Sequence, residues 1–177
     1  MAKVMNVVVV SASPRKNANT QTVMKYVVEH ASSKNVKVKF INLSIDQVEC
    51  YKGPDENYSE TTKQAAKDLM DADVWLIGTP IYNSFFSSAL KNLFEYVDYK
   101  KTAGKVAGVT IIAAGNIGFI DVQTLVTQLL SYFRIIANPK AVFITTDAIS
   151  NSNLSEDTKE RLREMVDSTL DIAVKLR

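Results

Sequence analysis

Two cations and a run of hydroxyl and amide side chains follow an apolar segment near the start of the chain. Residues 11–20 read SASPRKNANT, and four consecutive valines stand close before them. Arg15 can hold a phosphate through two parallel N–H bonds, whereas Lys16 acts as a point charge. If a helix follows, its free N–H groups and positive dipole end attract the same anion. The segment therefore indicates a phosphate-binding loop, with a capped turn bearing solvated charges as the alternative.

A second group of polar and aromatic side chains lies near the middle of the chain. Residues 78–88 read GTPIYNSFFSS and come directly after a short apolar run. Tyr82 can lie against a flat heteroaromatic ring, and nearby backbone amides can bond the edge of that ring. The alternative is a helix start with its aromatic side chains packed beneath it. A third segment, AGNIG at residues 114–118, has two glycines that allow close backbone approach or an ordinary turn.

Strand-like and helix-like segments alternate along the chain and must position these three loops. Apolar and β-branched runs predict strands at residues 4–10, 36–43, 73–78, 105–114 and 140–144. Apolar residues at helical spacing predict helices at residues 20–32, 59–70, 87–96, 121–133 and 154–176, with Ser155 capping the last. Residues 44–58 are polar and predict a long irregular loop.

Five strands alternating with five helices imply an α/β fold with a parallel sheet covered by helices on both faces. In such open sheets, ligands bind beyond the carboxyl ends of the strands, where the strand order reverses. The loops after the first, third and fourth strands, at residues 11–20, 79–86 and 114–120, therefore fall on one edge. The position of all three loops at one edge of the sheet is stronger evidence for a ligand site than any one loop alone.

The composition bounds the class of protein. The 177 residues suit a single domain spanning 1–177, and 46% apolar with 23% charged residues is typical of a globular chain. The net charge of +2 does not indicate binding to nucleic acid or to an anionic membrane. One cysteine and one histidine exclude a disulfide framework and a multi-ligand metal site. We find no signal-peptide pattern and no membrane-length apolar stretch, and expect a cytoplasmic protein.

Other proteins with this arrangement of elements are excluded by what the loops lack. A receiver domain needs acidic residues where the first strand ends, but Ser11, Ala12 and Ser13 stand there. A low-molecular-weight phosphatase needs a cysteine in the first loop, but Cys50 lies elsewhere. No carboxylate pair or Ser/His/Asp set falls on the sheet edge. A site without an acid–base set suits a cofactor that carries its own chemistry, such as a flavin.

The first two loops resemble known signatures. SASPRKNANT resembles the GSPRKNGNT-type phosphate loop of the NADPH-dependent FMN reductase family, with Ala12 and Ala18 departing from the family pattern. TPIYNSFFSSALKNLFEYV resembles that family's second signature, which runs along the isoalloxazine ring. The resemblance implies a flavodoxin-like fold, with a five-stranded parallel sheet in the order 2-1-3-4-5. The family contains FMN reductases, azoreductases and quinone reductases.

The resemblance implies a function and a set of site residues. The protein would pass a hydride from NADPH or NADH to FMN and on to a small-molecule acceptor such as free flavin, a quinone or an azo compound. The FMN phosphate would meet Ser13, Arg15, Asn19, Thr20 and the neighbouring Gln21, and the ring would meet Pro80, Ile81, Tyr82, Asn83, Ser84 and Gly115. The alternative is a flavodoxin-type electron carrier without NAD(P)H activity, although such carriers are typically strongly acidic. Neither the acceptor nor the preferred nicotinamide is readable from the sequence.

Aromatic residues gather around the third predicted helix, at residues 85–99, and one more lies in the fourth, at residues 121–133; together they suggest an interface between copies of the chain. They are Phe85, Phe86, Phe94, Tyr96, Tyr99 and Tyr132. Exposed apolar patches often mark interfaces, and the family resemblance implies a homodimer or homotetramer. The alternative is that these aromatic side chains pack under the loop at residues 44–58.

Overall fold

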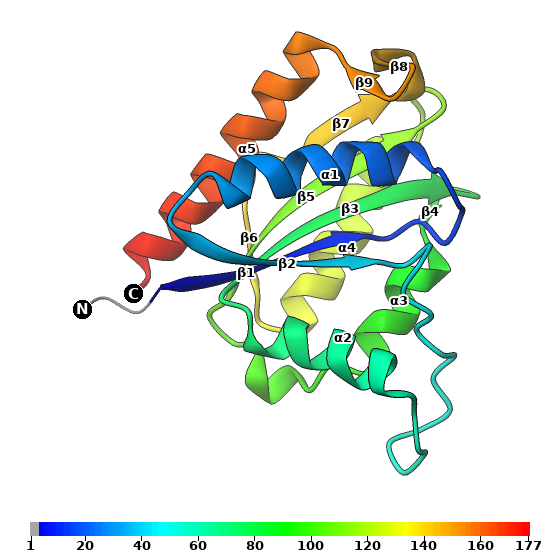
Figure 1. The fold of residues 1–177 in the computed structure, drawn as a ribbon, viewed down its shortest axis with the longest axis vertical. Helices are drawn as coiled ribbons and strands as arrows, with labels where there is room; N and C mark the ends of the chain where they lie inside the picture. Colours follow the sequence, from blue (N-terminus) through cyan, green and yellow to red (C-terminus); the bar gives the residue numbers. More distant parts are fainter. Residues whose placement is uncertain (1–3) are drawn as a thin grey trace.

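The computed structural model describes residues 4–177, so residues 1–3 of the domain expected at 1–177 lie outside the described part. A parallel sheet runs through the centre in the order β2-β1-β3-β5. Two short strands, β6 and β7, follow one another along the outer edge of β5 (Figure 1). The strands of this sheet are β1 (Met5–Ser11), β2 (Val36–Asn42), β3 (Val74–Tyr82), β5 (Val106–Ala113), β6 (Ile136–Ala137) and β7 (Val142–Thr145). The predicted parallel order 2-1-3-4-5 is confirmed, but the sheet has seven strands rather than five, because the fifth strand is in two pieces and the antiparallel strand β4 (Phe85–Phe86) pairs with the end of β3.

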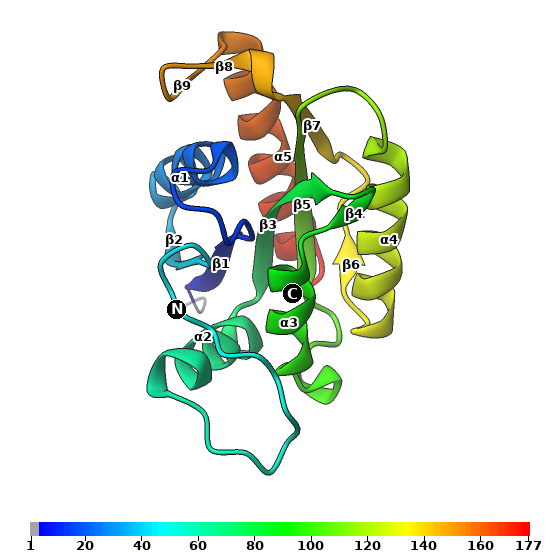
Figure 2. The same cartoon turned by 90° about the vertical axis from the view of Figure 1, so that its right-hand side faces the viewer.

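Helices cover both faces of the sheet, as predicted. α1 and α5 lie on one face, and α2, α3 and α4 lie on the other (Figures 1 and 2). The helices are α1 (Asn19–Ser32), α2 (Glu60–Asp71), α3 (Ser88–Glu95), α4 (Phe119–Tyr132) and α5 (Glu156–Lys175), and short 3-10 turns occupy Tyr99–Lys101 and Thr146–Ala148. Within residues 4–177, no helix combines the length and apolar character that crossing a bilayer requires.

The third strand is longer than predicted. It continues past Gly78 to Tyr82 and folds back into β4 (Phe85–Phe86). Pro80 lacks an N–H group and suggested a break, but β1 has already ended opposite Gly78. One side of β3 is therefore unpaired at Pro80, and the missing donor costs no ladder bond on that side. The segment predicted as a loop at residues 79–86 is thus the end of β3, a two-residue turn and the short strand β4.

The fifth strand is interrupted where the sequence reads Asn138-Pro139. The buried Asn138 amide turns away from the sheet and donates hydrogen bonds to Ser168 Oγ and Thr169 Oγ1 of α5, each at 2.8 Å. Pro139 cannot donate to a ladder. Pairing with β5 resumes only at Val142, so the strand predicted at residues 140–144 begins two residues later.

Two glycines let the helices approach the sheet closely. A Cβ atom at Gly78 would lie 2.2 Å from Sδ of Met24 in α1, and one at Gly108 would lie 2.4 Å from Sδ of Met165 in α5. A Cβ at either position would force the methionine side chain to shift, so glycine at both positions allows this packing. Because α1 packs closely on the sheet, its first turn lies over the carboxyl end of β3.

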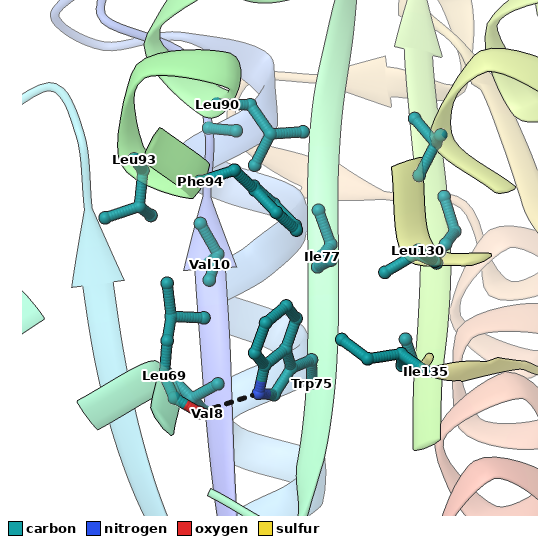
Figure 3. Close-up of a cluster of buried hydrophobic side chains, with 14 of the residues drawn as sticks. Val8, Val10, Leu69, Trp75, Ile77, Leu90, Leu93, Phe94, Leu130 and Ile135 are labelled. Carbon is teal, nitrogen blue, oxygen red and sulfur yellow. Dashed lines mark hydrogen bonds between the residues drawn. The ribbon is translucent and has the colours of Figure 1, made fainter. Parts of the chain in front are cut away.

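The opposite face of the sheet is packed around Trp75. Its indole N–H donates to the carbonyl oxygen of Leu69 at 2.9 Å, and its ring meets Phe94 edge-on at 5.4 Å (Figure 3). Phe94 also contacts Phe133, with ring centroids 5.2 Å apart. Phe94 is 2% exposed, so its expected place in an interface between copies is wrong and it belongs to the core.

Candidate functional site

A hollow of about 360 Å³ lies where the carboxyl ends of β1, β3, β5 and β7 meet. Its lining brings together parts of the chain more than 100 positions apart. The lining residues are Arg15, Lys16, Asn17, Ala18, Asn19, Thr20, Pro80, Ile81, Tyr82, Ile112, Ala113, Ala114 and Thr146. All three predicted loops contribute to it, as the rule for open α/β sheets requires.

One end of the hollow is formed by the first turn of α1, which has no side-chain cap among the described residues. Ala18 occupies the N-cap position and accepts no hydrogen bond through its side chain. The side chains of serines cap three other helices, at Ser59, Ser87 and Ser155. Without such an acceptor, the first N–H groups of α1 stay available to an anion, and the helix dipole favours one.

Two exposed cations stand beside this helix start. Arg15 and Lys16 belong to the loop that enters α1, and Asn17 takes a left-handed conformation with φ of 54°. None of the described side chains that line the hollow is acidic. Backbone N–H groups, a guanidinium and an ammonium in the absence of carboxylates form a donor set that matches a phosphate dianion.

Ser13 connects this loop to the other wall of the hollow. Its hydroxyl lies 2.9 Å from the hydroxyl of Tyr82 and accepts a hydrogen bond from the Arg15 N–H at 3.3 Å. Ser13 is only 1% exposed and does not line the hollow. Its hydroxyl therefore fixes Tyr82 and the turn at Arg15.

The opposite wall is mostly apolar. At the end of β3, Pro80 pairs with Ile112 of β5, and Ile81 is the next residue of β3. Pro80, Ile81 and Ile112 all line the hollow. Gly118 closes the third loop in a left-handed conformation with φ of 87°, and its Cβ position lies 3.7 Å from the Ile81 side chain. Glycine is needed there because an L side chain rarely adopts that φ. The wall suits one face of a planar ring system.

The remaining predicted site residues lie around the hollow rather than in it. Gln21 faces a neighbouring hollow on α1. Asn83 and Ser84 form the exposed tip of the hairpin between β3 and β4, with φ of 49° and 64°. Gly115 is exposed one residue beyond Ala114, and a Cβ there would have no atom within 4 Å.

Sequence reasoning did not single out several lining residues. Lys16, Asn17 and Ala18 stand within the first predicted loop, and their part follows from the loop itself. Thr146 comes after the fifth strand, whose carboxyl end was not among the predicted loops. A threonine directly following a strand at the same sheet edge was the available signal.

Comparison with known proteins gives the family. Residues 5–148 match the family described as NADPH-dependent FMN reductase. The chain belongs to the NADPH-dependent FMN reductase family. The matched span contains both loops on which the resemblance was based, and it ends just after Thr146.

Individual relatives agree with this family. The NADPH azoreductase of Bacillus sp. (strain OY1-2) is 26% identical over 163 residues, which cover 92% of this chain and 89% of the relative. The structure of the NADH:FMN oxidoreductase EMOB superposes with a TM-score of 0.81 at 18% identity, over 97% of this chain and 89% of that one. A flavodoxin, WrbA-like protein from Agrobacterium tumefaciens gives a TM-score of 0.72 at 18% identity, over 98% and 99%. The fold of this family member is flavodoxin-like.

Proposed function

We propose that this protein is an FMN-dependent NAD(P)H oxidoreductase that reduces a small-molecule acceptor such as free flavin, a quinone or an azo compound. One observation carries the proposal: a single hollow joins an uncapped, cationic helix start to a wall that is mostly apolar, and no carboxylate lines it. Those are the requirements of a phosphate joined to a planar ring. Membership of the NADPH-dependent FMN reductase family and the similarity to an azoreductase support it.

FMN bound in this hollow would supply the redox chemistry, taking up a hydride from NADPH or NADH and returning two electrons to the acceptor. The chain's part is to bind, orient and exclude water. Arg15, the side chains of Asn19 and Thr20, and the free N–H groups of α1 hold the phosphate. Gln21 lies beside them, and Ser13 acts by fixing Tyr82.

The ring end of the site is assigned to the end of β3 and the third loop. Pro80, Ile81 and Tyr82 form the wall against one ring face, and Asn83, Ser84 and Gly115 border its edge. Because Asn83, Ser84 and Gly115 are exposed, this edge stays open to a nicotinamide or an acceptor. The side chains that line the hollow include no histidine, cysteine or carboxylate to act as an acid–base pair.

A flavodoxin-type electron carrier is the second candidate, because the fold is shared. Loading the purified protein with FMN, removing free flavin and adding NADPH without oxygen separates the two. Loss of the flavin's visible absorbance on adding NADPH or NADH supports the reductase. A flavin that bleaches only with dithionite contradicts it and identifies a carrier.

The proposal includes a homo-oligomer, dimer or tetramer, formed through the surface of β4 and α4. Several large apolar side chains are exposed on and beside these two elements, which contact one another. Their exposed fractions are 54% for Phe85, 90% for Ile117, 66% for Ile120 and 67% for Tyr132. Tyr96 does not join them, because it packs against Tyr51 and Tyr58 of the long loop.

Sedimentation tests this interface. Ile120→Lys places a charge on the exposed apolar surface and is expected to shift an oligomer to monomers at micromolar concentration. Ile45→Lys, on an equally exposed isoleucine in another loop, is the control and leaves the oligomer intact. A monomeric unmodified protein contradicts the interface.

The proposed reductase is one FMN-binding domain over residues 1–177, and it acts in the cytoplasm, where reduced nicotinamides are available.

A further inference from the structure

The Tyr82 hydroxyl stands out among the groups of the candidate flavin site because it can release a proton. Among the described side chains that line the hollow, the titratable ones are Arg15, Lys16 and Tyr82. A guanidinium does not release its proton in a protein, and Lys16 is exposed in the loop that enters α1, at the proposed phosphate end. Tyr82 is partly buried at the last residue of β3, at the proposed ring end. Proton transfer by a side chain of this hollow therefore falls to Tyr82.

The hydrogen bond between Ser13 and Tyr82 has a direction that follows from the donors and acceptors around it. Ser13 is buried, and its oxygen already accepts the Arg15 N–H, so its own proton needs an acceptor. In the described part of the chain, that acceptor is the Tyr82 hydroxyl oxygen, 2.9 Å away. If Tyr82 donated instead, the Ser13 proton would be buried without a partner, which is unfavourable. Ser13 therefore donates, and the Tyr82 proton is left free for a ligand in the hollow.

Tyr82 is held at both ends. Its backbone pairs with Phe85 of β4 across the two-residue turn, and its hydroxyl is held by Ser13. The bonds from the Arg15 N–H to Ser13 and from Ser13 to Tyr82 run in one direction, so each strengthens the next. The last donor of this chain, the Ser13 hydroxyl, can stabilise a negative charge on the Tyr82 oxygen. The site thus presents an oriented O–H group whose conjugate base is already hydrogen-bonded.

We propose that Tyr82 donates the proton that an acceptor such as a quinone requires when it is reduced. The inference rests on the proposed function, which supplies a hydride from NAD(P)H by way of the flavin. One hydride and one proton together convert a quinone to a hydroquinone. The O–H bond of Tyr82 breaks, its proton adds to a quinone oxygen, and the phenolate keeps the hydrogen bond from Ser13. A proton from water then restores the phenol, because the turn beside it at Asn83 and Ser84 is exposed.

Single-turnover oxidation of the FMN-loaded protein tests this role against direct protonation by water. Protein saturated with FMN is bleached with NADPH without oxygen and mixed with tetramethyl-1,4-benzoquinone or with ferricyanide, which takes electrons but no proton. Tyr82→Phe is expected to slow the return of flavin absorbance about 100-fold with the quinone and less than about twofold with ferricyanide. Tyr132→Phe, on an exposed tyrosine that does not line the hollow, is the control and changes neither rate.

Ser13→Ala tests the positioning role of Ser13 and keeps the phenol in place of removing it. The freed Tyr82 hydroxyl can still donate but is no longer oriented, so the quinone reaction should slow by about tenfold. The ferricyanide reaction should again stay within about twofold, because the oriented proton is not used there. A variant in which only the packing had changed would slow both reactions alike.

Binding of the quinone provides a readout that does not depend on turnover. Without a nicotinamide the oxidised, FMN-loaded protein cannot reduce tetramethyl-1,4-benzoquinone, but Tyr82 can still donate a hydrogen bond to its carbonyl oxygen. Tyr82→Phe is expected to raise the Kd for the quinone roughly 2- to 12-fold, and Tyr132→Phe to leave it unchanged. The change in flavin fluorescence on titration with the quinone measures both.

Four results overturn the inference. Tyr82→Phe slows the quinone and ferricyanide reactions equally, it slows neither, the Kd for the quinone does not change, or the unmodified protein passes no electrons to the quinone. In each case, FMN-loaded protein that is bleached by NADPH keeps the proposed reductase function. Protein that binds no flavin, or whose flavin is bleached only by dithionite, fails both.

Discussion

The hydroxyl groups of Ser13 and Tyr82 lie 2.9 Å apart and join the loop after β1 to the end of β3, 69 positions along the chain. The loop carries the cations at the start of α1, and the end of β3 forms part of the apolar wall of the hollow. Ser13 also accepts the N–H of Arg15 at 3.3 Å. A single buried hydroxyl thus connects the cationic loop to the apolar wall, which are the proposed phosphate and ring ends of the site.

Removing this hydrogen bond is expected to weaken FMN binding. Tyr82→Phe keeps the ring and loses the hydroxyl, and a neutral hydrogen bond contributes about 0.5–1.5 kcal/mol, or roughly 2- to 12-fold in Kd. Ser13→Ala should have a similar effect, and the double variant should be no worse than the stronger single one. Fluorescence titration of the three variants measures this, and additive losses would show that the two hydroxyls act separately.

Arg15→Ala is expected to weaken FMN binding more strongly. A hydrogen bond to a charged group is worth about 1.5–3 kcal/mol, which corresponds to roughly 10- to 150-fold in Kd. Arg15→Lys keeps the charge without the two parallel N–H bonds, so its Kd for FMN should lie between those of the unmodified protein and Arg15→Ala. Lys37→Ala is the matched control on an exposed cation outside the site. Unchanged affinity in Arg15→Ala would remove the assigned phosphate role.

The hairpin between β3 and β4 holds Asn83 and Ser84 in left-handed conformations. Both central residues of this two-residue turn need positive φ, and Asn-Gly suits it better than Asn-Ser. Ser84→Gly is therefore expected to stabilise the protein by about 1 kcal/mol in urea denaturation. Ser152→Gly, in the equivalent turn between β8 (Ile149–Ser150) and β9 (Asn153–Leu154), should act in the same direction. A loss of stability in both would contradict the assigned conformations.

Burial raises the pKa of Tyr96 to about 12, with Tyr58 beside it adding to the shift. An ordinary tyrosine in the unfolded chain titrates near pH 10. The folded state therefore holds this proton more tightly, and the stability it contributes is complete below about pH 10 and is lost as the pH rises to about 12. The unfolding free energy should fall across that interval.

Tyr96→Phe isolates this contribution. At neutral pH the variant should be about 0.5–1.5 kcal/mol less stable, because Tyr96 donates a hydrogen bond to the Glu49 carbonyl at 2.8 Å. Between about pH 10 and 12 the difference should narrow, since the variant has no phenol to titrate there. Urea denaturation over this range, with Tyr132→Phe on an exposed tyrosine as control, measures it. A constant difference would show that Tyr96 is not the titrating group.

The sheet and its loops were predictable because local patterns determine them. Buried β-branched runs and helical spacing gave the order of elements, and the carboxyl-end rule placed the loops at one edge. Pairing between distant segments was not readable: Pro80 suggests a break unless the end of β1 is known, and Asn138 suggests a turn without revealing its bonds to α5.

The candidate site shows the same division. Arg15, Asn19 and Thr20 were found because they are neighbours in one motif. Thr146 was missed, since its place beside them depends on how β7 pairs with β5. The aromatic residues near α3 divide between core and surface according to tertiary packing, so Phe94 is buried while Phe85 is exposed. Periodicity alone does not distinguish these two fates.

Trp75, the chain's one tryptophan, makes the protein its own optical reporter. Its indole is fully buried, so its emission should lie at short wavelength in the native state and move to the red on unfolding. Trp75 and Tyr82 stand on the same strand, seven residues and about 23 Å apart at the usual rise per residue. Tryptophan emission overlaps flavin absorption, so a flavin seated against Tyr82 lies within energy-transfer range. One intrinsic fluorophore thereby reads out both folding and occupancy without a label.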